Sequence, residues 1–551
     1  MRRKVLLLLL LTAFIFGFAV AKVDHPITAA LVSQAGRLIG VEFSDEHNEM
    51  MVRSLEMNRN AYEAIQAFEL KNEIAPALVF DHLPAGYQPP ALQGRIQWDI
   101  PVDVELPADR NELAFYSIPE LASLIRGRKI SSEELTRFFL ERLEQYGDTL
   151  EAVVTLTTET ALAQARHADR DIAEGRYRGP LHGIPYGAKD LLAVEGYKTT
   201  WGAMPYKDQV INETAAVIRK LDEAGAILVA KLTLGALAMG DIWFGGVTKN
   251  PWNLEQGSSG SSAGSASTVS AGLLPFAIGT ETLGSIISPS TRCGTTGLRP
   301  TYGRVSRQGA MALSWSMDKI GPIARSAWDC AIVLEAISGK DSKDVTTVEA
   351  GFSVPARAEL PNFRIGYIKA FFDEDYPGKE NDQKVLADLQ VMGLRLEAVE
   401  WDFSVPVSAL RIILTAEAAA AFDELTLSGR DSLLVAQGPN AWPNTFRAAR
   451  FTPAVEYINA NRLRKILVEE VYALMKEYDV VVTPSYGGSQ LLVTNLTGNP
   501  CLVAPNGFNA GGSPTSISFI GNLYEEGKLV TLAGAWQEFT GHHQKHPPMF
   551  K

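Results

Sequence analysis

Residues 257–285, GSSGSSAGSASTVSAGLLPFAIGTETLGS, are rich in hydroxyl groups and small side chains. Eight of the nine residues 257–265 are Gly or Ser. Apolar residues such as Val269 and Leu273 follow, and this apolar pattern argues against a flexible Gly/Ser linker. Small residues let backbone N–H groups approach a ligand oxygen closely, as in anion-binding nests and oxyanion holes. The segment therefore predicts a serine-dependent site that stabilises a negatively charged oxygen.

Two short patterns of other serine enzymes also occur. Residues 260–264, GSSAG, match the G-x-S-x-G nucleophile elbow, but that elbow follows a strand, and residues 250–256 are loop-like. Residues 316–319, SMDK, match S-x-x-K, but no K-T-G partner is present. Neither pattern finds the partners that its enzyme class requires.

The distribution of histidine argues against a histidine base. The eight His residues are at 25, 47, 82, 167, 182, 542, 543 and 546, so none lies between 183 and 541. A His-based triad would have to use His182 or one of the C-terminal residues His542, His543 and His546. Lysine is the natural substitute, because burial can lower its pKa until the neutral amine accepts a proton from serine.

Several stretches, in order along residues 117–540, resemble the motifs of the amidase signature family. The stretch LHGIPYGAKD at 181–190 resembles the lysine motif, and NPWN at 250–253 with the Gly/Ser run resembles the serine motif. The stretch PFAIGTETLGS at 275–285 resembles the motif around the nucleophile, with further matches at 293–294, 297–306, 318–322 and 495–500. The resemblance implies an α/β fold with a large mixed, twisted β-sheet flanked by helices.

Within this family, the matching positions imply a Ser-Ser-Lys triad. Ser285 matches the nucleophile, Lys189 the base, and Ser261 the serine that bridges them from a cis peptide. Ser262 is expected to make structural hydrogen bonds instead. The residues whose backbone N–H groups match the oxyanion hole are Thr282, Leu283, Gly284 and Ser285. The resemblance implies no metal and no organic cofactor.

The sequence departs from the family pattern close to the predicted nucleophile. Leu283 stands where the family usually has Gly, and Ile287 where it usually has Arg. A side chain at 283 would narrow the approach to the oxyanion hole or forbid a positive φ. Loss of the arginine would remove an internal ion pair with Glu281. We therefore expect an intact triad with altered rate or substrate range, and a weak or inactive member remains an alternative.

Residues 231–240, KLTLGALAMG, are apolar at positions that are polar in relatives. One hypothesis is an acyl pocket lined by Leu234, Leu237 and Met239 that favours an uncharged apolar group. The alternative is that this stretch is plain helix core.

The elements that must position these residues alternate between helix and buried strand. Helices are expected to begin with capping patterns at Ser117 and Ser131 and to run over 158–173 and 213–224. Short apolar runs at 226–230, 480–482 and 502–504 are typical of buried strands. This alternation predicts an α/β domain over 111–551.

The N-terminal part differs from this domain. Residues 1–21 combine the basic start Arg2-Arg3-Lys4, an apolar run and a final Ala-Val-Ala, which predicts a cleaved secretory signal peptide and export. An uncleaved membrane anchor is the alternative. Residues 22–110 are expected to form an N-terminal helical segment and a proline-rich connector.

Composition narrows the function classes. The 551 residues carry 51 Lys and Arg against 63 Asp and Glu, a net charge of −12, which argues against nucleic-acid binding. The three scattered cysteines are expected to be buried small side chains. The sequence thus predicts an exported amidase for small or peptide-terminal amides. It predicts no stable membrane insertion after signal cleavage, and it is compatible with a homodimer. The alternatives are the glutamine-amide-releasing subunit of a tRNA-dependent amidotransferase and an inactive binding protein.

Overall fold

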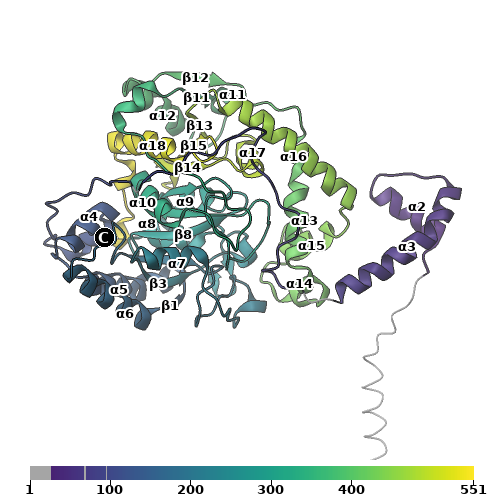
Figure 1. Cartoon of the computed structure of the whole chain (residues 1–551), viewed down its shortest axis with the longest axis horizontal. Helices are drawn as coiled ribbons and strands as arrows, with labels where there is room; N and C mark the ends of the chain where they lie inside the picture. The colour runs from purple at the N-terminus through teal and green to yellow at the C-terminus, as the bar shows by residue number, and fades with distance from the viewer. Residues whose placement is uncertain (1–25, 68–69, 95) are drawn as a thin grey trace, which may run out of the picture. The chain divides into compact units, whose positions relative to one another are not determined.

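The computed structural model describes residues 26–67, 70–94 and 96–551, and the chain forms two compact units, residues 1–70 and 71–551 (Figure 1). The smaller unit contains helices α2 (Ala29–Leu38) and α3 (Asp45–Gln66). The side chains of Thr28 and Ser44 cap them by accepting backbone N–H groups of the first turn. The helical N-terminal segment is thus confirmed, whereas the predicted signal peptide lies outside the described residues.

The larger unit is built on an eleven-stranded sheet with the order β1-β3-β2-β8-β10-β9-β14-β15-β13-β11-β12. Strand β2 pairs in parallel with β3 and β8, and β11 pairs in parallel with β12 and β13, whereas the remaining pairs are antiparallel. The predicted mixed sheet is therefore confirmed. Its strands are β1 (Val153–Leu156), β2 (Pro185–Lys189), β3 (Ile227–Leu232), β8 (Phe276–Glu281), β9 (Thr296–Arg299), β10 (Lys319–Ala324), β11 (Ile365–Ile368), β12 (Leu396–Val399), β13 (Val480–Pro484), β14 (Cys501–Phe508) and β15 (Pro514–Gly521). Two short ribbons pair β4 (Ile242–Trp243) with β5 (Gly246–Val247) and β6 (Lys249–Asn250) with β7 (Asn253–Gly257).

Helices flank this sheet, as Figure 1 shows. The helices of the larger unit are α4 (Ile118–Arg126), α5 (Ser132–Leu150), α6 (Thr158–Ala173), α7 (Ala216–Glu223), α8 (Ala263–Ser270), α9 (Ile287–Cys293), α10 (Ala327–Ile337), α11 (Lys369–Asp373), α12 (Lys379–Val391), α13 (Ile412–Ala421), α14 (Asp423–Leu427), α15 (Trp442–Ala449), α16 (Ala454–Met475), α17 (Gln490–Thr497) and α18 (Glu526–Thr540), of which α13, α14 and α15 lie to one side of the sheet. The capping boxes predicted at Ser117 and Ser131 are both present. Among the described residues, no helix has the length and apolar character needed to cross a membrane.

The core lies between the sheet and these helices, and the strands that carry the site are wholly buried. Every residue of β2 and β8 is buried, and the two strands run in parallel with Ala188 opposite Ile278. The carboxyl ends of β2 and β8 therefore bring Lys189 and Thr280 to the same edge of the sheet. All three cysteines are buried and free, as predicted.

The proline-rich connector belongs to the larger unit and runs along its surface. Asn72 bonds to the backbone of Ala312, and the Trp98 indole donates to Glu335 at 2.6 Å. The connector therefore packs against the body of the larger unit.

Candidate active site

Lys189 ends strand β2 and is completely buried. Its Nζ lies 2.8 Å from Ser261 Oγ, 3.0 Å from Ser262 Oγ and 2.9 Å from Thr280 Oγ1. Burial lowers the pKa of Lys189 well below its usual value, and the charges of Asp318 and Glu281 only partly oppose that effect. Burial in this site therefore favours the neutral form of the Lys189 amine over the charged form.

The aspartate that follows Lys189 has a different partner. Asp190 forms a buried ion pair with Lys231 at 2.6 Å and accepts hydrogen bonds from the backbone and hydroxyl of Thr200. Asp190 therefore does not pair with Lys189, and in the part of the chain that the structure describes the Lys189 amine bonds to hydroxyl and carbonyl oxygens.

Ser261 is buried and follows a cis peptide bond from Gly260, the geometry that the family resemblance implied. A Cβ at Gly260 would lie 1.9 Å from the carbonyl oxygen of Gly240, so only glycine fits there. The small residues of the Gly/Ser segment thus serve close backbone packing that directs the Ser261 hydroxyl toward Lys189.

Ser262 has a larger part in the site than the sequence indicated. Its hydroxyl contacts Lys189 Nζ, donates to the carbonyl of Thr280 at 3.1 Å and accepts the Thr280 N–H at 3.1 Å. Its own N–H donates to the carbonyl of Ser285 at 3.1 Å. The structural hydrogen bonds predicted for Ser262 are present, and they join the segments that carry Lys189, Ser261 and Ser285.

Ser285 lies two residues before helix α9 and is 8% exposed. No hydrogen bond of its Oγ is present in the described part of the chain, so the hydroxyl is free to turn. Ser261 bonds to Lys189, whereas no hydrogen bond joins the Ser261 and Ser285 side chains in the described part of the chain. Catalytic hydrogen bonds of apo enzymes are often long and tighten on substrate binding.

The backbone from Thr282 to Ser285 carries N–H groups without partners. Within the described residues, none of these four N–H groups donates a hydrogen bond inside the protein. The adjacent N–H groups of Ile286 and Ile287 are instead held by Glu281 Oε2 at 2.8 and 3.0 Å. Unpaired backbone donors in a mostly buried turn before a helix can stabilise an oxyanion.

The two departures from the family pattern have milder effects than expected. The positive φ of this turn, +87°, falls on Gly284, so Leu283 is not strained and packs partly buried against the core. Residue 287 is not an arginine, but Glu281 still has a cationic partner, because Arg299 Nη1 lies 2.7 Å from Glu281 Oε1. Burial alone would raise the pKa of Glu281, but the Arg299 charge and hydrogen bonds lower it to about 2.

A cavity of about 280 Å³ is lined by Thr280, Thr282, Asp318 and Ala238. Lys189, Ser261 and Ser285 do not line it, but it reaches them through Thr280, whose Oγ1 lies 2.9 Å from Lys189 Nζ. Asp318 accepts a hydrogen bond from Thr282 Oγ1 at 2.6 Å, which fixes the side chain at the start of the N–H turn. Thr280, Asp318 and Arg299 lie within the family motifs, which are the sequence signal for them, but the resemblance assigned no role to these three residues.

The predicted acyl-pocket residues do not gather at this cavity. Leu234 and Leu237 are fully buried in the main core, and Met239 packs partly buried against it. The stretch is a short 3₁₀ turn, Ala236–Ala238, in which Leu237 and Ala238 have φ of 51° and 63°. This turn directs Leu237 into the core and leaves Ala238 at the cavity wall.

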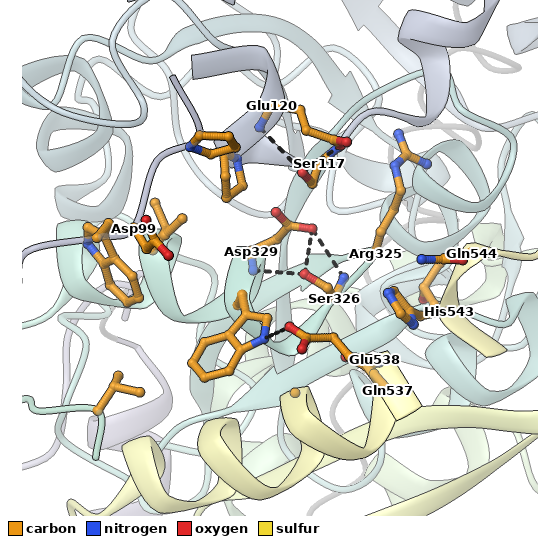
Figure 2. Close-up of a pocket in the computed structure, with 18 of the residues that line it drawn as sticks. Asp99, Ser117, Glu120, Arg325, Ser326, Asp329, Gln537, Glu538, His543 and Gln544 are labelled. Atoms are coloured by element: carbon orange, nitrogen blue, oxygen red, sulfur yellow. Dashed lines mark hydrogen bonds between the residues drawn. The ribbon is translucent and has the colours of Figure 1, made fainter. Parts of the chain in front are cut away.

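A larger cavity of about 960 Å³ lies elsewhere and contains none of the triad (Figure 2). Three of its four acidic side chains accept hydrogen bonds from neighbours: Glu120 from Ser117, Asp329 from Ser326 and Glu538 from the Trp328 indole. Two of these carboxylates, Glu120 and Asp329, belong to the capping boxes at the starts of α4 and α10.

Comparison with known proteins agrees with this geometry. The sequence model of the Amidase family matches residues 134–530. The chain belongs to the amidase signature family. It is therefore an enzyme that acts on amide C–N bonds, and the mixed sheet is the fold of this family.

Individual relatives in the family point to two kinds of amide chemistry. The chain is 32% identical to the glutamyl-tRNA(Gln) amidotransferase A subunit of Moorella thermoacetica, over 80% of this chain and 99% of that protein. The corresponding subunit of Dechloromonas aromatica is 33% identical, over 78% and 98%. The native peptide amidase from Stenotrophomonas maltophilia is similar in structure, with a TM-score of 0.70 and 28% identity over 80% of this chain and all of that one.

Proposed function

We propose that this enzyme hydrolyses a carboxamide to a carboxylate and an amine or ammonia through an acyl-enzyme on Ser285. The observation that carries the proposal is the buried Lys189 amine at 2.8 Å from Ser261 Oγ, beside unpaired N–H groups before α9. A neutral amine next to hydroxyl groups is the arrangement that a serine nucleophile needs for activation.

In the first half of the reaction, Ser285 Oγ attacks the amide carbon while its proton passes to Ser261, and the proton of Ser261 passes to Lys189. The oxyanion that forms is stabilised by N–H groups of the turn 282–285, each worth about 3–4 kcal/mol in comparable sites. Protonated Lys189 then returns its proton through Ser261 to the leaving amine as the C–N bond breaks.

In the second half, water attacks the acyl-enzyme and passes a proton into the same relay. The Ser285 oxygen leaves and recovers that proton, which frees the carboxylic acid product. Each proton taken up is returned, so the triad ends the cycle unchanged.

We further propose small or peptide-terminal amides as substrates and an exported location. The likeness to a peptide amidase and the cavity of about 280 Å³ beside Thr282 support the substrate class. The basic start, the apolar run and the Ala-Val-Ala site before Lys22 support export. N-terminal sequencing of protein recovered from the medium or periplasm tests the second point, with cleavage after Ala21 expected and retention of residues 1–21 in the cell interior against it.

Fluorophosphonate labelling tests the chemistry directly. The purified enzyme is expected to be modified at Ser285, and Ser285→Ala should abolish both labelling and amide turnover. An unlabelled, inactive wild-type protein would favour the binding-protein alternative.

The amidotransferase alternative rests on the relatives of 32–33% identity that are matched over nearly their full length. It predicts release of ammonia from glutamine that is stimulated by partner proteins. The amidase proposal predicts turnover of simple amides by the protein alone. A substrate panel with glutamine, primary amides and peptide amides separates the two.

A further inference from the structure

One side of the cavity that reaches the triad through Thr280 is formed by an irregular segment far away in sequence. Residues 71–75, the strap, contribute Asn72, Glu73 and Ala75 to the lining of the cavity that Thr280 and Thr282 also line. The strap contains no helix or strand, and its backbone makes only a local turn, from Ile74 N to the Lys71 carbonyl at 3.0 Å.

The strap is held in place through the amide of one residue. Asn72 Nδ2 donates to the Ala312 carbonyl at 2.8 Å and to the Ala421 carbonyl at 3.3 Å, and Asn72 Oδ1 accepts the Ala312 N–H at 2.7 Å. In the described part of the chain, every hydrogen bond between the strap and the rest of its unit comes from this amide. Both amide protons and the amide oxygen are thus used to fix the strap.

The position of this clamp ties it to the cavity. Ala312 belongs to the run Ala310–Leu313, which lines the cavity together with the strap. The backbone of Leu313 also donates to Asp318, whose other oxygen holds Thr282. The clamp therefore lies at a wall of the cavity that is linked through Asp318 to the N–H turn.

We propose that Asn72 is a specificity-determining positioning residue, which holds the strap as the outer wall of the substrate cavity and so selects compact amides. This inference rests on the proposed amidase function. The cavity volume of about 280 Å³ is near the lower end of the range for small-molecule sites, so bulk at the wall limits which amides fit.

The test compares the specificity of variants toward small and bulky amides. Acetamide serves as the small substrate, 3-phenylpropanamide enlarges the acyl end, and N-benzylacetamide enlarges the amine end. For Asn72→Ala, the ratio of kcat/KM for a bulky amide to kcat/KM for acetamide is expected to rise on the order of tenfold in at least one series, the size expected when one or two net hydrogen bonds no longer hold the strap. Asn72→Asp keeps one acceptor but places a carboxylate oxygen against the Ala312 and Ala421 carbonyls, so its ratio should rise at least as far as that of Asn72→Ala.

Asn444→Ala is the matched control, because the Asn444 amide makes one local bond to the Pro439 carbonyl and does not line the cavity. Unchanged ratios in both series for a folded, fluorophosphonate-reactive Asn72→Ala would overturn the inference, as would an equal change in Asn444→Ala. A wild-type protein that hydrolyses none of the three amides and resists fluorophosphonate would instead contradict the amidase proposal. The specificity role proposed for Asn72 would then fall with it.

Discussion

The buried pair between Glu281 and Arg299 allows a prediction with a magnitude worked from the structure. Both side chains are completely buried, and Glu281 also holds the first N–H groups of α9 next to Ser285. The pKa of Glu281 falls from 4.5 to about 2, and a difference of roughly 2.5 units corresponds to about 3 kcal/mol of stability. Removing one partner of a buried pair typically costs about 3–5 kcal/mol, which agrees.

We therefore expect Arg299→Met to lower the free energy of unfolding at pH 7 by about 3 kcal/mol. A carboxylate whose pKa is lower in the folded than in the unfolded protein stabilises the fold. This stabilisation is fully present above the unfolded-state pKa of 4.5 and is lost as the pH falls toward the folded-state pKa of about 2. Wild type should thus gain the same stability from this pair at pH 7 and pH 5. In Arg299→Met, burial without the opposing cation raises the pKa of Glu281. The difference in free energy of unfolding between wild type and the variant should therefore be smaller at pH 5 than at pH 7.

Urea denaturation followed by tryptophan fluorescence at both pH values measures these differences. Arg292→Met is the control, because Arg292 lies exposed on α9. A deficit below 1 kcal/mol at pH 7, or one that grows toward pH 5, would refute the reasoning about Glu281.

Two further substitutions probe the reactive groups themselves. Lys189→Ala should lower kcat by roughly 10²–10⁴-fold while the circular dichroism spectrum stays native, because it removes the base from a relay whose other members remain; near-normal turnover would contradict the assignment. Gly284→Ala should reduce kcat/KM, because its φ of +87° disfavours any Cβ by about 1–2 kcal/mol and a Cβ would lie 3.1 Å from Leu491 Cδ2; a variant with normal kinetics would show that the turn 282–285 need not keep this conformation.

The parts of the fold that local signals determine were predictable. The capping patterns at Ser117 and Ser131 located the starts of α4 and α5, because cap side chains bond to their own first turn. The apolar run at 226–230 located β3, since a strand buried on both faces needs no alternation. The motifs around Lys189 and Ser261 likewise identified two side chains that the structure brings together.

What could not be predicted depends on contacts between distant segments. The Asn72 clamp joins residues 240 positions apart, and no pattern near Asn72 encodes it. The burial of Leu237 in the core could not be predicted either, because apolar composition does not reveal which way a turn points its side chains. The pairing of Glu281 with Arg299 replaces the contact expected at 287, because a buried carboxylate needs a cation but does not specify its position in the sequence.

The pH dependence of fluorophosphonate inactivation tests the neutral lysine most directly. Burial lowers the pKa of Lys189 well below 10.5, so the rate constant for modification of Ser285 should rise with pH and reach its plateau well below pH 10.5. Lys189→Ala should lose that titration and react slowly at every pH. A wild-type rate constant that keeps rising up to pH 10.5, as for a solvated lysine, would contradict the role of Lys189 as the base.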